Sequence, residues 1–316
     1  MLNLYQQAKG SDKVEYEAMV QSVLDIIDAN ITENIRADEL ARVVNYSLYH
    51  FCRVFLALTG TPVKSYITRR KLAYALYELS QGRRILDVAM DYGFETHAGF
   101  TKAFKKCYGY PPSLHRLHVI ANPPVKATIE SVKMKHGGTS MQVQFKELAP
   151  FTVVGYTSRH RMPGVNGISD IPAFWDMKNM EYSAALSTLH HTYTNSHHCE
   201  VSVCLDIDDE NECFTYMLGV GVDEADNSVA QRPGTYLHKI DGGLYAVFTT
   251  PLVDATQYIT AIQETWHEIL QEWLPGSEYE YDTARIAYEY YDERDHSWLH
   301  NGKSRMDICV PIRKRK

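Results

Sequence analysis

The most constraining feature of this sequence is a short pattern that occurs twice. A phenylalanine followed by four residues, a glycine, one residue and a proline begins at Phe55 and again at Phe104, 49 residues later. Upstream of each phenylalanine, two short stretches with helical periodicity are separated by a tight turn. Each copy therefore predicts a helix-turn-helix unit. Two such units in one chain suit a protein that grips two successive major-groove faces of double-stranded DNA.

The first unit is predicted to follow an amphipathic helix at 13–30. Its first helix runs over about 37–44, and its second, the recognition helix, runs over about 48–58. Asn45 suits the left-handed conformation that the turn between them needs. We expect Val43 and Leu48 to face the core of this unit.

A long helix over 62–80 is predicted to join the two units and to set their separation. In the second unit Gly93 makes the turn and Thr96 caps the recognition helix. Phe100 and Phe104 anchor this helix in the core, as Phe51 and Phe55 do in the first unit.

The charge is unevenly distributed. Residues 42–116 hold 12 basic and 4 acidic side chains, a net charge of +8, whereas the whole chain carries −7. The positive charge thus coincides with the repeated pattern, as contact with phosphates requires. The acidic remainder suits a different partner, although solubility alone also explains an acidic surface.

Composition excludes several classes of protein. The six cysteines form no C-x-x-C pair, which indicates reduced thiols and a cytoplasmic location. No run of about 18 apolar residues is present, so we expect no membrane span and no membrane partner. The sequence contains no nucleotide-binding or hydrolase motif, and the histidine spacing matches no ordered zinc site. We therefore expect no cofactor, no metal and no enzymatic activity.

Recognition helices read bases with the side chains that the core does not use. The candidate DNA-binding residues are therefore the free polar positions of the two helices: Tyr49, His50, Cys52, Arg53, His97, Thr101, Lys102 and Lys105. Arg53 can bond guanine O6 and N7 in bidentate fashion, and Lys102 can contact a base or a phosphate. The alternative is that each of these residues is an ordinary solvated side chain.

Residues 20–116 resemble the DNA-binding domain of the AraC/XylS family of bacterial transcription regulators. The resemblance is carried by Leu40-Ala41-Arg42, Tyr46-Ser47, Phe55, Thr59-Gly60, Pro62, Tyr66, Arg69-Arg70-Lys71-Leu72, Ile85, Val88-Ala89, Tyr92-Gly93-Phe94, Phe100, Phe104-Lys105-Lys106, Tyr108-Gly109 and Pro111-Pro112-Ser113.

The chain departs from this family at Asn45, where glycine is usual, and at Arg36, where a Ser or Thr cap is common. The resemblance places base-contacting residues at Tyr49, Cys52, Arg53, His97, Thr101 and Lys102. It implies promoter DNA and RNA polymerase as partners.

The second half of the sequence shows a different hydrophobic periodicity from the first. Residues 121–140 resemble a linker, which divides the chain into a DNA-binding domain at 1–120 and a second domain at 141–316. Alternating stretches predict strands at 145–158, 201–207, 213–222, 284–291 and 306–312. Helices are predicted at 168–180 and 254–273, and a hairpin is predicted around 241–243. The expected fold is thus an all-α tandem helix-turn-helix domain followed by an α+β domain of two β-α-β-β halves.

Residues 141–316 resemble the GyrI-like effector-binding domains of multidrug-sensing regulators, and the domain order resembles the Rob branch of the AraC family. The resemblance is carried by Phe145-Lys146-Glu147-Leu148, Ile171-Pro172-Ala173-Phe174-Trp175, Gly242-Gly243-Leu244-Tyr245-Ala246-Val247-Phe248, Glu272-Trp273-Leu274-Pro275, Tyr288-Glu289-Tyr290-Tyr291 and Asp307-Ile308-Cys309-Val310-Pro311-Ile312. It implies a small-molecule effector and a site built around a carboxylate among aromatic rings.

Glu289 fits the role of that carboxylate. On a strand, Glu289 and Tyr291 share one face, while Tyr288 and its neighbour at 290 share the other. The candidate effector-binding residues are Glu289, Trp175, Phe174, Tyr288 and Tyr291. An aromatic or cationic effector would pair with the carboxylate and stack on the rings.

Three alternatives remain open for the second half. Glu289 could lie in water on a strand whose aromatic residues form the core. The domain could be a hydrolase of small electrophiles, with Glu289 as general base. It could also be a module that only binds another protein.

Overall fold

The computed structural model describes residues 10–119, 121–133, 143–163, 186–193, 199–223, 233–292 and 300–315. The chain divides into two compact units. The first comprises residues 1–79, 85–107 and 121–138, and the second comprises residues 80–84, 108–120 and 139–316.

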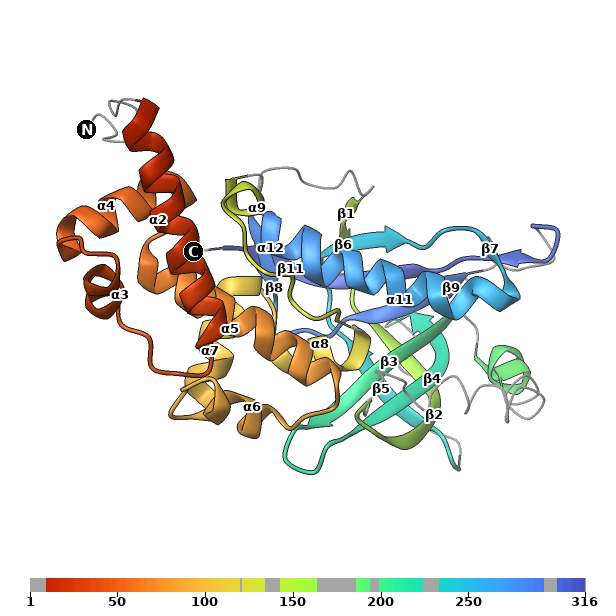
Figure 1. Cartoon of the computed structure of the whole chain (residues 1–316). Helices are drawn as coiled ribbons and strands as arrows, with labels where there is room; N and C mark the ends of the chain where they lie inside the picture. Colours follow the sequence, from red (N-terminus) through yellow and green to blue (C-terminus); the bar gives the residue numbers. More distant parts are fainter. Residues whose placement is uncertain are drawn as a thin grey trace. The chain divides into compact units, whose positions relative to one another are not determined.

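The first unit consists of helices (Figure 1). They are α2 (Gly10–Ala29), α3 (Ala37–Val43), α4 (Leu48–Thr59), α5 (Val63–Ser80), α6 (Ile85–Asp91), α7 (His97–Tyr108) and α9 (Ile129–Lys133). The pairs α3–α4 and α6–α7 are the two predicted helix-turn-helix units, and α5 is the predicted connector between them. The last residue of α5 and of α7 already belongs to the second unit.

The two helix-turn-helix units share the same local chemistry. Asn45 and Gly93, the turn residues, have φ of 58° and 77°, so both lie in the left-handed region. Each recognition helix is capped by a hydroxyl. The Ser47 side chain accepts the backbone N–H of residue 50 at 3.3 Å, and the Thr96 side chain accepts that of residue 99 at 3.0 Å. Gly60 ends α4 in the left-handed conformation. The turns at Asn45 and Gly93 and the cap at Thr96 confirm the sequence prediction.

The cores of the two helix-turn-helix units also correspond. Phe51, Phe55, Phe100 and Phe104 are fully buried, which stabilises each unit by about 1.5–3 kcal/mol per ring. The predictions for Val43 and Leu48 are wrong, because these side chains are 63% and 47% exposed. The packed face of α4 begins one turn later than expected, at Phe51, and α3 packs through Leu40 and Ala41, which leaves its last residue, Val43, outside the packed face.

Part of the segment expected to be a linker is folded. Ile129 of α9 is buried, and its backbone N–H donates to the side chain of Gln21 on α2. Asp28 of α2 accepts the backbone N–H of Ala127 and a paired contact from Arg70 of α5. Residues 127–129 thus pack on the first unit through buried and charged contacts.

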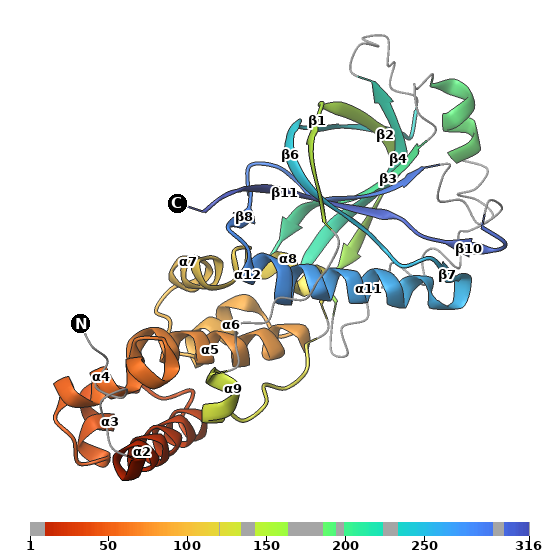
Figure 2. The ribbon, with the colours of Figure 1, turned by 90° about the horizontal axis from the view of Figure 1, so that it is seen from above.

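The second unit is built on a curled antiparallel sheet (Figures 1 and 2). Its strands are β1 (Gln144–Leu148), β2 (Phe151–Arg161), β3 (Cys199–Asp208), β4 (Cys213–Asp223), β5 (Tyr236–Ile240), β6 (Gly243–Thr249), β8 (Tyr279–Tyr281), β9 (Tyr288–Asp292) and β11 (Asp307–Lys314). The order is β1-β6-β11-β9-β3-β4-β2-β5, with β8 beside β11. Two short strands, β7 (Val253–Asp254) and β10 (Lys303–Ser304), pair separately.

The sheet shows the two expected β-α-β-β halves. Strand β2, a helix at 186–192, β3 and β4 form one half, and β6, α11 (Tyr258–Glu268), β9 and β11 form the other. The halves join where β3 pairs with β9. After α11, the chain continues as a π-helical turn (Ile269–Trp273) and the short α12 (Leu274–Gly276). The predicted helix at 168–180 lies outside the described residues.

The predicted hairpin around 241–243 is wrong. Strand β5 pairs with β2, whereas β6 pairs with β1 and β11, so the two strands lie in different halves of the sheet. The glycines at this corner serve close packing instead. A Cβ on Gly242 would lie 2.8 Å from the Leu148 carbonyl oxygen, and Gly243 has a φ of 134°.

One helix of the second unit comes from the N-terminal half of the sequence. Helix α8 (Pro112–His118) starts four residues after α7 ends and belongs to the second unit. It contacts α11 and lies beside it (Figure 2). Its residues Leu114, His115 and Arg116 are at most 5% exposed. The helix is therefore an internal part of this unit.

Candidate DNA interface and effector site

The recognition helix α4 presents a tyrosine–arginine pair. Tyr49 is 72% exposed, and its hydroxyl oxygen accepts a hydrogen bond from Arg53 Nη1 at 3.3 Å. The guanidinium also lies 5.4 Å from the centre of the Tyr49 ring. These side chains are one helical turn apart and share one face. The pairing pre-orients the guanidinium, which favours bidentate contact with a base edge.

The other two candidates on α4 are less available. The His50 ring stacks on Tyr46 at 5.2 Å between centroids and tilts against Tyr16 of α2 at 5.6 Å, so it is engaged in an aromatic cluster. Burial raises the pKa of the Cys52 thiol and keeps this side chain protonated. A neutral, half-buried thiol is a weak hydrogen-bond donor.

On α7, His97 and Lys102 are exposed, and Lys105 is half-buried in the last turn. Thr101 is different, because its Oγ1 is buried and has no hydrogen-bond partner among the described side chains. The hydroxyl of Thr101 thus faces the protein, which leaves only its methyl group for a base. Of the sequence candidates on α7, His97, Lys102 and Lys105 thus keep accessible polar groups.

A lysine on the connector α5 ties the two helix-turn-helix units together. Lys71 Nζ donates to the carbonyl oxygen of Glu33, in the loop before α3, at 2.9 Å. It also donates to the carbonyl of Tyr92, in the turn before α7, at 3.0 Å. Desolvation lowers the pKa of Lys71. One ammonium group thus fixes a backbone segment of each unit to the shared helix.

The candidate effector site centres on Glu289 of β9. Ser202 on the paired strand β3 donates its hydroxyl to Glu289 Oε2 at 2.8 Å, and Trp266 of α11 donates its indole Nε1–H to Oε1 at 3.1 Å. The residue is half-buried. Desolvation raises the pKa of Glu289, and the two hydrogen bonds partly oppose this effect.

Other groups surround this carboxylate. Tyr291 lies two residues further along β9, and burial together with the charge of Glu289 raises its pKa well above the usual range. Burial and the same charge raise the pKa of the Cys204 thiol on β3. In the part of the chain that the structure describes, no lysine or arginine forms an ion pair with Glu289. The carboxylate therefore has hydrogen-bond donors but no counter-charge.

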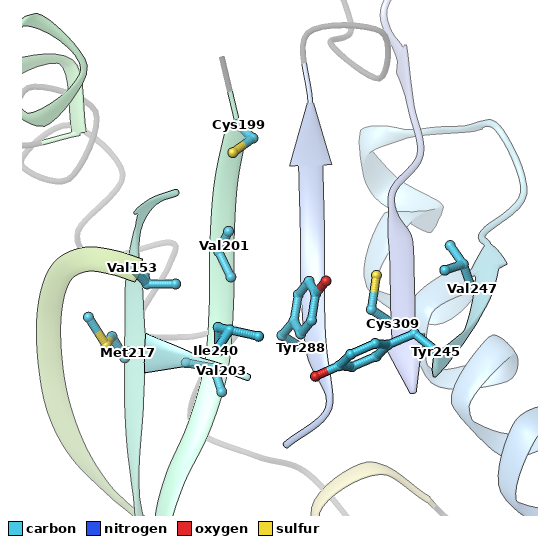
Figure 3. Close-up of a cluster of buried hydrophobic side chains, with 10 residues drawn as sticks. All are labelled: Val153, Cys199, Val201, Val203, Met217, Ile240, Tyr245, Val247, Tyr288 and Cys309. Carbon is cyan, nitrogen blue, oxygen red and sulfur yellow. The ribbon is translucent and has the colours of Figure 1, made fainter. Parts of the chain in front are cut away.

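Tyr288 lies on the opposite face of the sheet. It is 3% exposed and packs in an apolar cluster with Tyr245, Val201 and Cys309 (Figure 3). Strand pairing explains this, because Tyr288 faces Val203 and Glu289 faces Ser202 on β3. Tyr288 therefore supports the sheet behind the carboxylate and does not line the site.

The remaining sequence candidates, Phe174 and Trp175, lie outside the described residues. Sequence reasoning missed Ser202 and Trp266. Trp266 carried a usable signal, because it lies on the apolar face of an amphipathic helix and a buried indole N–H needs an acceptor. Ser202 carried none, since its partner is 87 residues away in the sequence.

Comparison with known proteins agrees with this architecture. A helix-turn-helix domain family matches residues 40–117, and the GyrI-like small molecule binding domain family matches residues 141–313, more than half of the chain. The chain belongs to the AraC-type helix-turn-helix regulators and carries a GyrI-like domain.

Three relatives illustrate the likeness. An uncharacterized regulator, YbfP of Bacillus subtilis, is 38% identical over 32% of this chain and 35% of its own length. The activator AarP of Providencia stuartii is 34% identical over 32% of this chain and 75% of its own length. The right origin-binding protein of Escherichia coli is 26% identical, but over 75% of this chain and 79% of its own length. The match thus spans about a third of YbfP, and of these three it covers more than half of this chain only for the right origin-binding protein.

The structure contains no helix, among the described residues, that is long and apolar enough to cross a membrane.

Proposed function

We propose that this protein is a transcription regulator that binds promoter DNA through α4 and α7 and an aromatic cation through Glu289. The observation that carries the effector assignment is a desolvated, half-buried carboxylate bonded by Ser202 and Trp266 and lacking a counter-charge among the described residues. We propose the cytoplasm as its location and RNA polymerase as a further partner, because a promoter-bound regulator acts there.

The charge of the ligand follows from electrostatics. A carboxylate removed from water without a cationic partner costs several kcal/mol, so the apo site favours any ligand that supplies a positive charge. The Trp266 and Tyr291 rings near the carboxylate add cation–π attraction of roughly 0.5–2 kcal/mol each. A neutral aromatic ligand gains the contact with the rings but not the charge pairing.

The decisive experiment compares two isosteric ligands. Phenyltrimethylammonium carries a positive charge, and tert-butylbenzene has the same shape without it. In calorimetric titration of the full chain, Glu289→Gln should weaken the cation by about 2 kcal/mol or more, roughly thirtyfold, and leave the neutral ligand nearly unchanged. The control is Glu147→Gln, at an exposed position of β1. Equal weakening of both ligands would refute charge pairing.

DNA binding is supported by the placement of basic side chains on both recognition helices, with Arg53 on α4 and Lys102 and Lys105 on α7. Both helices belong to the first unit, where Lys71 and α5 link them. Adjacent major-groove faces of DNA lie about 34 Å apart, one helical turn. We propose that one molecule occupies two such faces, with Tyr49, Arg53, His97 and Lys102 toward the bases.

One observation also favours a second candidate function, hydrolysis. A carboxylate whose pKa is raised by desolvation is a potential general base, and Tyr291 lies beside it on the same strand face. A hydrolase would consume a ligand with steady turnover. A sensor would bind it stoichiometrically and release it unchanged, which mass spectrometry of the recovered ligand distinguishes.

A further inference from the structure

Helix α8 places one of its own rings against Trp266, a hydrogen-bond donor to Glu289. The imidazole of His118 stacks on the Trp266 indole, with centroids 3.8 Å apart and planes 13° from parallel. Trp266 is the residue whose N–H holds Glu289, and it is only 2% exposed. An aromatic ligand at Glu289 therefore cannot stack on this face of the indole while His118 occupies it.

The rest of α8 is seated by contacts to both halves of the sheet domain. Leu117 packs against the apolar cluster of the first half, which includes Phe214 and Leu218. His115 lies 3.3 Å from Gln271 in the π-helical turn that follows α11. The helix thus lies between the first-half core and the element that carries Trp266.

The packing of α8 leaves a buried guanidinium incompletely hydrogen-bonded. Arg116 is 3% exposed, and its ion pair with Glu212 has a long N–O distance of 3.4 Å. Its Nε and Nη1 are buried with no hydrogen-bond partner among the described residues. Unpaired donors on a buried cation are costly, so departure of α8 into water regains hydration of the guanidinium. That gain lowers the cost of undocking the helix.

The charge state of His118 allows an aromatic cation to replace it on the Trp266 ring. Desolvation lowers its pKa to about 3, so the ring is neutral near neutral pH. A neutral imidazole stacks on the indole but offers Glu289 no charge. An aromatic cation can supply both the stacking and the charge, and should therefore compete successfully for the same face.

We propose that His118 is an internal occupant of the effector site and that an aromatic cation displaces it, releasing α8 from Trp266. The proposal rests on the effector role of Glu289. It adds a residue from outside the GyrI-like match, because His118 precedes residue 141. It also gives the effector a covalent route to DNA binding, since α8 starts four residues after the second recognition helix ends.

The test combines ligand affinity with hydrogen exchange on the full chain. His118→Ala removes the competing ring, so phenyltrimethylammonium should bind about 2- to 10-fold more tightly, the range expected for loss of one stacked aromatic pair. Amide protons of residues 113–118 should exchange faster by a similar factor, about 2- to 10-fold, in this variant. Saturation of the wild type with the cation should also speed their exchange. Ser113→Ala, at a half-buried position of α8, is the control and should change neither quantity.

The outcomes separate the two proposals. If the cation binds in a Glu289-dependent way but does not change exchange in α8, or binds His118→Ala more weakly, His118 is a fixed wall and the displacement mechanism is wrong. The effector assignment would then stand. If the cation binds neither the wild type nor His118→Ala, the effector assignment fails and the displacement mechanism fails with it.

Discussion

Replacement of Lys71 by methionine should loosen the pair of helix-turn-helix units. Methionine keeps most of the apolar stem but loses the ammonium, which donates to the carbonyls of Glu33 and Tyr92 at 2.9 and 3.0 Å. A hydrogen bond to a charged group contributes about 1.5–3 kcal/mol, and partial exposure reduces this value. We therefore expect the two bonds together to contribute about 2–4 kcal/mol to the stability of the first unit.

The matched control is Lys64→Met, which removes the same charge from an exposed position on the same helix. Native-state hydrogen exchange of the amides in α6 and α7 reports the free energy of opening in this unit alone. Lys71→Met should lower this free energy of opening by about 2–4 kcal/mol, and Lys64→Met should lower it by less than about 0.5 kcal/mol. Equal values for the two variants would refute the role of Lys71 as a tie between the units.

Three further predictions follow from individual residues. Arg53→Ala should cost about 1–3 kcal/mol on a cognate site and relax base preference there; equal loss on every sequence would reduce Arg53 to a phosphate contact. Asn45→Val should lower the stability of the first unit by about 1–2 kcal/mol, measured by chemical denaturation, because Asn45 has a φ of 58°; an unchanged midpoint would contradict this. Desolvation raises the pKa of Glu289, so its proton is lost at a higher pH than that of an ordinary glutamate. Affinity for phenyltrimethylammonium should therefore increase as the pH rises through that pKa, and affinity for tert-butylbenzene should not; parallel profiles would contradict the assignment.

The sequence predicted the helical unit well because its signals are local. Asn45 and Gly93 each act within one turn of the chain, and their left-handed φ angles are those expected. The exposed Val43 and Leu48 show where periodicity fails, at helix ends that extend past the packed face. The repeat gave the count and spacing of the units, because both copies carry the same core residues.

Most strands of the sheet domain were predictable, but the single strand expected at 145–158 is two strands, β1 and β2, and the pairing of the strands was not predictable. The stretch at 241–243 has the composition of a hairpin, yet its flanking strands pair with β2 on one side and with β1 and β11 on the other. The alternation of side chains along β9 correctly predicted that Glu289 and Tyr288 lie on opposite faces of the sheet. The donors to Glu289 come from β3 and α11, and His118 comes from a helix assigned to the DNA-binding half of the sequence. Such contacts depend on long-range topology, which local patterns do not contain.

The central claim is that ligand capture at Glu289 changes DNA binding by the same molecule. The most direct measurement is the affinity of the full chain for promoter DNA at constant salt, with and without saturating phenyltrimethylammonium, in the wild type and in Glu289→Gln. We predict a change in DNA affinity on addition of the cation in the wild type that is absent in Glu289→Gln at the same cation concentration. An affinity of the wild type for promoter DNA that does not change on addition of the cation, or an equal change in both proteins, would contradict this prediction.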